Sequence, residues 1–147
     1  MEIRFAKEED LKSIIELFKA HTSYEKVTFI EGNKVELLRK QLFNSKEGLK
    51  CIVVESVGDI VGYATFIKQF STWDVHYYIY LDCLFLKKSV RGKGLGKDIL
   101  EIIKQYAKSV NCSIIQWQTP TFNKRAIQFY NELGAESKSK ERFTWGI

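Results

Sequence analysis

The stretch that decides the fold is residues 77–117, YYIYLDCLFLKKSVRGKGLGKDILEIIKQYAKSVNCSIIQW. It opens with a β-rich run, 77–86, that is apolar almost throughout, and we expect this run in the middle of a sheet with both faces covered. After a glycine-rich segment, apolar residues keep helical spacing from Leu95 to Tyr106, and a strand pattern returns at 113–117. Such a strand-helix-strand unit is usually parallel and right-handed, so the glycine segment lies at the carboxyl end of the first strand.

The residues before this unit predict the rest of the sheet. Residues 2–6 alternate as a strand does, and the apolar residues within 11–18 repeat at helical spacing. Asn33 is a candidate N-cap for a second helix that ends near Asn44. Two strand-rich runs within 51–67 flank a short glycine-containing turn, which predicts an antiparallel hairpin.

The residues after this unit predict a last helix and a last strand. Asn123 can cap a helix with one apolar face, and Gly134 stands at its C-cap position. A short final strand is expected near 142–145. The whole chain, residues 1–147, is therefore expected to form a single α/β domain. Its sheet is mixed and mostly antiparallel, with one parallel unit and with helices on both faces.

Charge and composition limit the partners. The chain carries 23 Lys and Arg against 18 Asp and Glu, and the net charge of +5 favours anionic partners. Acids are interleaved with the bases, and no run of like charges marks a nucleic-acid arm, so we expect no nucleic-acid partner. The first twenty residues are acidic instead of signal-like, and no apolar run approaches membrane-spanning length. We therefore expect no membrane partner and a cytoplasmic location.

The cysteines and histidines do not form a metal-binding pattern. Cys51, Cys83 and Cys112 are widely separated, which fits neither a disulfide framework nor a metal site, and we expect buried reduced thiols. His21 and His76 have no partner at ligand spacing, so surface or core positions are expected for both. The sequence predicts no bound metal.

Residues 91–97, Arg-Gly-Lys-Gly-Leu-Gly-Lys, have the features of a phosphate-binding loop. Backbone N–H groups and the positive end of the helix dipole converge where a strand leads through such a loop into a helix. Glycine lets an anion approach the main chain, and Arg91, Lys93 and Lys97 add positive charge. A Walker A loop fits less well because Asp98 follows Lys97, and the dinucleotide fingerprint requires a different glycine spacing. A solvated glycine turn is the alternative.

Two motifs resemble those of the GNAT N-acetyltransferase family. Arg91-x-x-Gly94-x-Gly96 matches the family's R/Q-x-x-G-x-G/A signature and follows an apolar strand, as that signature requires. Residues 123–135, NKRAIQFYNELGA, are similar to the family's later motif, a helix that starts at Asn and ends in Leu-Gly-Ala. The resemblance implies the GNAT acyl-CoA N-acyltransferase fold and acetyl-CoA as cosubstrate.

Within the family, residues 77–135 look most like the diamine (spermidine/spermine) acetyltransferase branch, which Tyr24-Glu25 also resembles. That branch has adjacent acids, Glu-Asp, where this chain has Asp82-Cys83. This departure weakens a polyamine assignment. Relatives commonly form homodimers, so the resemblance also implies a homodimer.

The resemblance implies a set of residues that bind acetyl-CoA. The set comprises the strand backbone before the loop, the loop itself and the last helix. Its members are Leu84, Phe85, Leu86, Arg91, Gly92, Lys93, Gly94, Leu95, Gly96, Lys97, Asn123, Lys124, Arg125, Ala126 and Glu132. One N–H group of residues 84–86 would polarise the acetyl carbonyl.

Two residues are candidates for catalysis. Tyr130 stands where the family places its general acid, and a phenol can protonate the leaving thiolate; from helical spacing alone, a core tyrosine is the alternative. Asp82 is an acid within a central strand and is a candidate for removing the amine proton through water. An outward-pointing or salt-bridged aspartate is the alternative for Asp82. Cys83 is expected to be a packed thiol.

By the same resemblance, an amine pocket is expected around the Tyr24-Glu25 pair. Its members are Tyr24, Glu25, Asp82, Gln116, Trp117 and Gln118. The expected reaction is direct acetyl transfer in a ternary complex, from acetyl-CoA to a primary amine of a diamine, a polyamine or a lysine-like molecule. The alternatives are a protein N-terminus, an amino acid or an aminoglycoside as acceptor, and a noncatalytic CoA-binding module.

Overall fold

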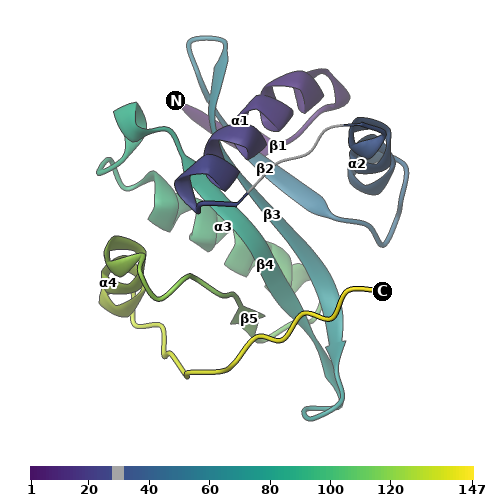
Figure 1. Ribbon diagram of the computed structural model, residues 1–147, viewed down its shortest axis with the longest axis vertical. Helices are drawn as coiled ribbons and strands as arrows, with labels where there is room; N and C mark the ends of the chain where they lie inside the picture. The colour runs from purple at the N-terminus through teal and green to yellow at the C-terminus, as the bar shows by residue number, and fades with distance from the viewer. Residues whose placement is uncertain (28–31) are drawn as a thin grey trace.

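A computed structural model describes residues 1–27 and 32–147 of the chain (Figure 1). In these residues, one mixed sheet has the strand order β1-β2-β3-β4-β5. The strands are β1 (Glu2–Phe5), β2 (Lys50–Ser56), β3 (Asp59–Ser71), β4 (His76–Leu86) and β5 (Ile115–Gln116). The helices are α1 (Leu11–Tyr24), α2 (Lys34–Phe43), α3 (Leu95–Ser109) and α4 (Lys124–Glu132), with short 3₁₀ turns η1 (Glu8–Asp10) and η2 (Lys88–Val90). None of these helices is long and apolar enough to cross a membrane.

The strand pairing confirms the predicted α/β architecture. β1 to β4 pair antiparallel, and β4 pairs parallel with β5 after the crossover through α3. The predicted hairpin joins β2 to β3 through Val57 and Gly58, whose φ angles of 52° and 82° are those of a tight turn. The glycine loop therefore lies where β4 leads into α3 (Figure 1).

The sheet is covered by α1 on one face and by α3 on the other (Figure 1). The alternation of β2 explains this arrangement, because successive side chains of a strand point to opposite faces. Cys51 and Val53 pack in the cluster that contains Ile14 of α1. Ile52 and Val54 pack in the cluster that contains the apolar face of α3. Two apolar cores result, one on each face.

A β-bulge interrupts β4 at Asp82. Thr65 of β3 pairs with Cys83 and Phe66 pairs with Leu81, so Asp82 is an extra residue without a partner on β3. Leu81 therefore packs against the α3 face, whereas Cys83 packs against the α1 face, and Asp82 is exposed. The expectation that both faces of this run are covered was thus wrong at Asp82 and at the first residues of the strand, which are also exposed.

Three further expectations differ from the structure. Residues 142–145 form no strand, and Phe143 and Trp145 are more than 90% exposed, because a strand requires a neighbour to pair with. Asn33 precedes α2 but makes no side-chain cap, since its ψ of 2° is not the extended conformation of an N-cap. The strand expected at 113–117 is limited to β5, which pairs with β4 at two residues.

Hydrogen-bonded ion pairs connect β1 to η1 and β2. Arg4 donates two hydrogen bonds to Asp10, at 2.7 and 3.0 Å, and further bonds to Glu55. The Lys7 N–H donates to the same carboxylate at 2.7 Å. Asp10 is buried, so these bonds compensate the loss of its hydration.

Asp10→Asn is expected to lower the free energy of unfolding by about 2 kcal/mol at pH 7. Hydrogen bonds from Arg4 hold the pKa of Asp10 below its ordinary value of 3.8, so the carboxylate stabilises the fold above that pH. This stability is lost as the pH falls through the lower pKa of the folded state. Urea unfolding should therefore show a difference from wild type that shrinks below about pH 4. Glu9→Gln, in an exposed ion pair, is the control and should change stability by less than about 0.5 kcal/mol.

Candidate functional site

The glycine loop has the geometry of an anion site. Gly92 and Gly94 have φ angles of 80° and 81°, and a Cβ added to either would meet no heavy atom within 4 Å. Open space therefore lies beside the loop. α3 begins at Leu95, and the first N–H groups of a helix have no partner inside it. The space, these donors and the positive end of the helix dipole together suit the pyrophosphate of a nucleotide cofactor.

Gly96 has a packing role in addition to the role expected from the motif. A Cβ at this position would lie 3.1 Å from Cζ of Phe129 on α4. The absence of a side chain thus allows α4 to pack against the start of α3. Part of the glycine motif therefore fixes the position of α4, which carries Tyr130.

The start of α4 is fixed by the predicted cap. The Ala126 N–H donates to Oδ1 of Asn123 at 3.3 Å, and Lys124 and Arg125 are exposed in the first turn. Glu132 lies at the other end of α4 and accepts a hydrogen bond from Gln128 at 2.8 Å. The structure therefore separates Glu132 from the other expected cofactor residues of this helix.

Of the basic residues in the loop, Arg91 turns toward α1. Its Nε donates to the Leu86 carbonyl at 2.8 Å, and its guanidinium lies 4.8 Å from the ring centroid of Tyr24 and 5.5 Å from that of Phe85. Lys93 and Lys97 are exposed. Arg91 therefore connects the cofactor loop to the residues expected on the amine side.

The resemblance implies that the backbone of β4 next to the loop binds the cofactor. β4 pairs with β5 at Ile79 and Tyr80, and beyond this point the chain leaving β5 turns away toward α4 (Figure 1). The side chains of Leu84 and Leu86 pack toward α3, and that of Phe85 packs toward α1. Because these side chains are packed, any contact of residues 84–86 with a ligand would be made by their backbone.

Candidate residues from three parts of the fold lie near one another. His21 and Glu25 come from the end of α1, Asp82 from the bulge of β4, and Tyr130 from α4. Glu25, Arg91 and Asp82 are all close enough to His21 to affect its pKa, and Glu25 is close enough to affect the pKa of Tyr130. Glu25 is therefore near both His21 and Tyr130, and Asp82 is near His21.

Tyr130 is held by aromatic packing. Its ring centroid lies 5.0 Å from that of Trp117 and 5.2 Å from that of Phe129. Burial, with a further effect of Glu25, raises the pKa of Tyr130 to about 12, so the hydroxyl stays protonated at neutral pH. Trp117 contacts Tyr130, whereas Gln116 and Gln118 on either side of it are exposed.

Cys83 is partly buried behind Asp82, and its Sγ lies 3.7 Å from Oδ2 of Asp82. Burial raises the pKa of the Cys83 thiol to about 11, so the thiolate needed for nucleophilic attack is scarce at neutral pH. This fits a packed thiol. Cys51 and Cys112 are buried and free, as expected.

The hydrogen bonds of His21 were not predicted. Its Nδ1 lies 2.7 Å from the Tyr63 hydroxyl, and its Nε2 lies 3.4 Å from Oε1 of Glu25. The spacing of His21 and Glu25, four residues apart on a helix, was the available signal. No sequence pattern indicated the contact between His21 and Tyr63, because it depends on how α1 packs on β3.

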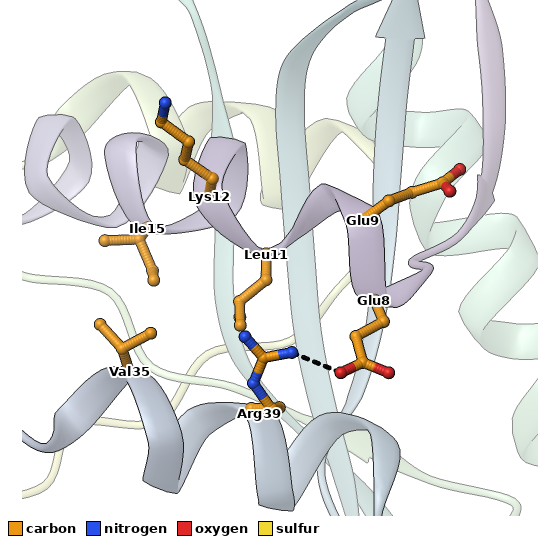
Figure 2. A pocket seen from close by; sticks show the side chains of 7 residues that line it. All are labelled: Glu8, Glu9, Leu11, Lys12, Ile15, Val35 and Arg39. Carbon is orange, nitrogen blue, oxygen red and sulfur yellow. Dashed lines mark hydrogen bonds and ion pairs between the residues drawn. The ribbon is translucent and has the colours of Figure 1, made fainter.

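A pocket of about 420 Å³ lies elsewhere, between η1, the start of α1 and α2 (Figure 2). An ion pair between Arg39 and Glu8 lies at its edge. The lining residues are Glu8, Glu9, Leu11, Lys12, Ile15, Val35 and Arg39. None of the residues expected in the site is among them, so the glycine loop remains the candidate site.

Comparisons with known proteins identify the family of the chain. The acetyltransferase (GNAT) family matches residues 6–135. Thialysine N-epsilon-acetyltransferase of Bos taurus is 31% identical over 142 residues, which cover 91% of this chain and 83% of that protein. A probable spermine N(1)-acetyltransferase of Bacillus subtilis subsp. natto is 28% identical over 122 residues, which cover 78% of this chain and 75% of that protein.

A solved structure has the same fold. The aminoglycoside acetyltransferase from an uncultured soil metagenomic sample has a TM-score of 0.84 at 18% identity, covering 99% of this chain and 95% of that chain. At this identity the likeness concerns the fold alone. The match over residues 6–135 establishes more: this chain belongs to the acetyltransferase (GNAT) family, whose enzymes use acetyl-CoA.

Proposed function

We propose that this chain acetylates a primary amine of a small cationic acceptor, such as a diamine, a polyamine or a lysine-like molecule, by direct attack in a ternary complex. The observation that carries the proposal is that Glu25 and Asp82 both lie close enough to His21 to raise its pKa, and that Glu25 also lies close enough to Tyr130 to raise the pKa of Tyr130. Two carboxylates in one region attract a cation. The names of the thialysine and spermine acetyltransferases support the same acceptor class.

In this proposal, each group of the site has one role, and acetyl-CoA supplies the thioester. The N–H groups at the start of α3 bind its pyrophosphate, and a backbone N–H of residues 84–86 donates to the acetyl oxygen as negative charge develops there. Asp82 accepts the proton of the amine through water, because an ammonium has no lone pair with which to attack. Glu25 binds the cationic acceptor.

The role of Tyr130 follows from its pKa. A phenol with a pKa of about 12 is a weaker acid than a thiol, whose ordinary pKa is about 8.5, so full transfer of the Tyr130 proton to the leaving thiolate is unfavourable. Tyr130 therefore acts mainly as a hydrogen-bond donor to the leaving sulfur while charge develops on it. Water then completes the protonation.

Replacement of the two acids should separate binding from proton transfer. Glu25→Gln is expected to raise the KM for the amine about tenfold, and Asp82→Asn to lower kcat about 100-fold, both with unchanged KM for acetyl-CoA. Steady-state kinetics with each substrate varied in turn measures this. Asp59→Asn, at the exposed start of β3, is the control. Unchanged kinetics in both site variants would show that these carboxylates are surface charges.

The acceptor class is tested by following acetyl-CoA consumption over a panel of polyamines, lysine-like amino acids, peptides and aminoglycosides. We expect the highest kcat/KM for a small acceptor with two or more amines. A preference for peptide N-termini or for aminoglycosides would replace this proposal with one of its alternatives. No reaction with any amine, together with tight acetyl-CoA binding, would indicate a CoA-binding module.

The proposal includes a homodimer, inferred from the resemblance, and a cytoplasmic location, inferred from the first residues and the apolar pattern of the sequence. The exposed Phe143 and Trp145 support association, because large exposed aromatic side chains are typical of contact surfaces. Light scattering on the purified chain tests the dimer. A monomer at all concentrations would contradict it.

A further inference from the structure

His21 lies in the last turn of α1, with a side chain that is only 12% exposed. Three neighbours surround its ring. Nδ1 is 2.7 Å from the Tyr63 hydroxyl, Nε2 is 3.4 Å from Oε1 of Glu25, and the ring stacks on Phe85 with centroids 5.0 Å apart and an interplanar angle of 27°. The ring orientation is therefore set by contacts with α1, β3 and β4.

The chemistry of the partners fixes the direction of both hydrogen bonds. A carboxylate only accepts, so Nε2 must carry a hydrogen and donate to Glu25. Burial lowers the pKa of His21 more than Glu25 raises it, so the ring is neutral at neutral pH and Nδ1 is an acceptor. Tyr63 is buried, and burial raises its pKa, so its hydroxyl keeps the hydrogen that it donates to Nδ1. The two hydrogen bonds therefore run in one direction: Tyr63 donates to His21, and His21 donates to Glu25.

We propose that His21 is a positioning residue for the acceptor amine, which holds the Glu25 carboxylate toward the site through Nε2–H and is itself held by Tyr63 and Phe85. This inference rests on the proposed function, in which Glu25 binds the cation. The contact with His21 uses Oε1 and leaves Oε2 to meet the acceptor ammonium. Both ring nitrogens are engaged, so His21 is not the base that deprotonates the amine.

Two substitutions at His21 distinguish the contribution of the ring from that of its Nε2–H donor. His21→Phe keeps a flat ring against Phe85 and removes both nitrogens, and we expect the KM for the amine to rise about tenfold with kcat within about threefold of wild type. His21→Gln loses the ring but restores a donor to the residue four positions later on the helix. It should return the KM to within about threefold of wild type. The KM for acetyl-CoA should not change in either variant.

Two further variants test the hydrogen bond between Tyr63 and His21. Tyr63→Phe removes only the hydroxyl, which frees Nδ1 and lets the ring take either tautomer, so the KM for the amine should rise by a few-fold. Phe18→Leu is the matched control, because the Phe18 ring packs on Tyr63 at 4.7 Å without a hydrogen bond. It should leave the KM for the amine unchanged, although it lowers stability by about the cost of a smaller core side chain.

A double-mutant cycle decides the mechanism. If His21 acts through Glu25, the variant with both His21→Phe and Glu25→Gln should have nearly the KM of Glu25→Gln alone. Additive increases would overturn the inference, as would a His21→Phe protein with wild-type KM for the amine. A wild-type enzyme that acetylates no cationic amine would overturn the proposed function, and with it the inference. Acetylation with an unchanged KM in His21→Phe would overturn the inference alone.

Discussion

Tyr130→Phe is expected to lower kcat about 100-fold while the Kd for acetyl-CoA stays within about twofold of wild type. The substitution keeps the ring that packs between Trp117 and Phe129 and removes only the hydroxyl. Because the pKa of Tyr130 is raised to about 12, the wild-type enzyme should show no loss of kcat from ionisation of this group below about pH 11.

Tyr106→Phe is the matched control for this prediction. Tyr106 is also partly buried, and it packs on Phe66 from α3, away from the site. Single-turnover kinetics and thermal unfolding should both be measured, because a purely structural Tyr130 would give the reverse pattern, with lost stability and nearly intact turnover. Wild-type kcat in Tyr130→Phe at every pH would eliminate the proposed role.

Gly94→Val is expected to weaken acetyl-CoA binding at least tenfold, and Gly58→Val to leave it unchanged. Both glycines have nearly the same φ, 81° and 82°, and a Cβ at either would meet no heavy atom within 4 Å. The two variants therefore carry a similar cost for a left-handed valine, about 1–3 kcal/mol. Only at Gly94 does the new side chain enter the space assigned to the pyrophosphate.

The measurements are the free energy of unfolding and the Kd for acetyl-CoA by calorimetry. Similar losses of stability with a selective loss of binding would support the loop as the pyrophosphate site. Equal Kd values in folded Gly94→Val and Gly58→Val proteins would remove the loop from the binding site. Gly96→Val is less suitable, because its side chain would also displace Phe129.

The strand-helix-strand unit and its loop could be predicted because local patterns determine them. The apolar period of 95–109, the glycines and the cap at Asn123 are properties of short segments, and the structure has α3 and α4 there. The strand expected at 142–145 failed for the opposite reason, since alternation within a segment does not supply the neighbour that a strand requires.

The candidate site was predictable only in part. Tyr130 was chosen from a resemblance, and Asp82 was chosen because an acid within a central strand is uncommon. The packing of α1 on the sheet places His21 near Asp82 and Glu25 near Tyr130. That packing was not visible in the sequence, so the contact between His21 and Tyr63 was missed. The bulge at Asp82 was missed as well, because register depends on the opposing strand and a single strand does not reveal it.

The extra residue in β4 also affects how the enzyme can evolve. Asp82 pairs with no residue of β3 and contributes nothing to either core, so its identity is free of the constraints on Leu81 and Phe85. Substitutions there should change the free energy of unfolding by less than about 0.5 kcal/mol, whatever they do to kcat. Under the role proposed for Asp82, the chemistry at this position can therefore change without compensating changes in the scaffold.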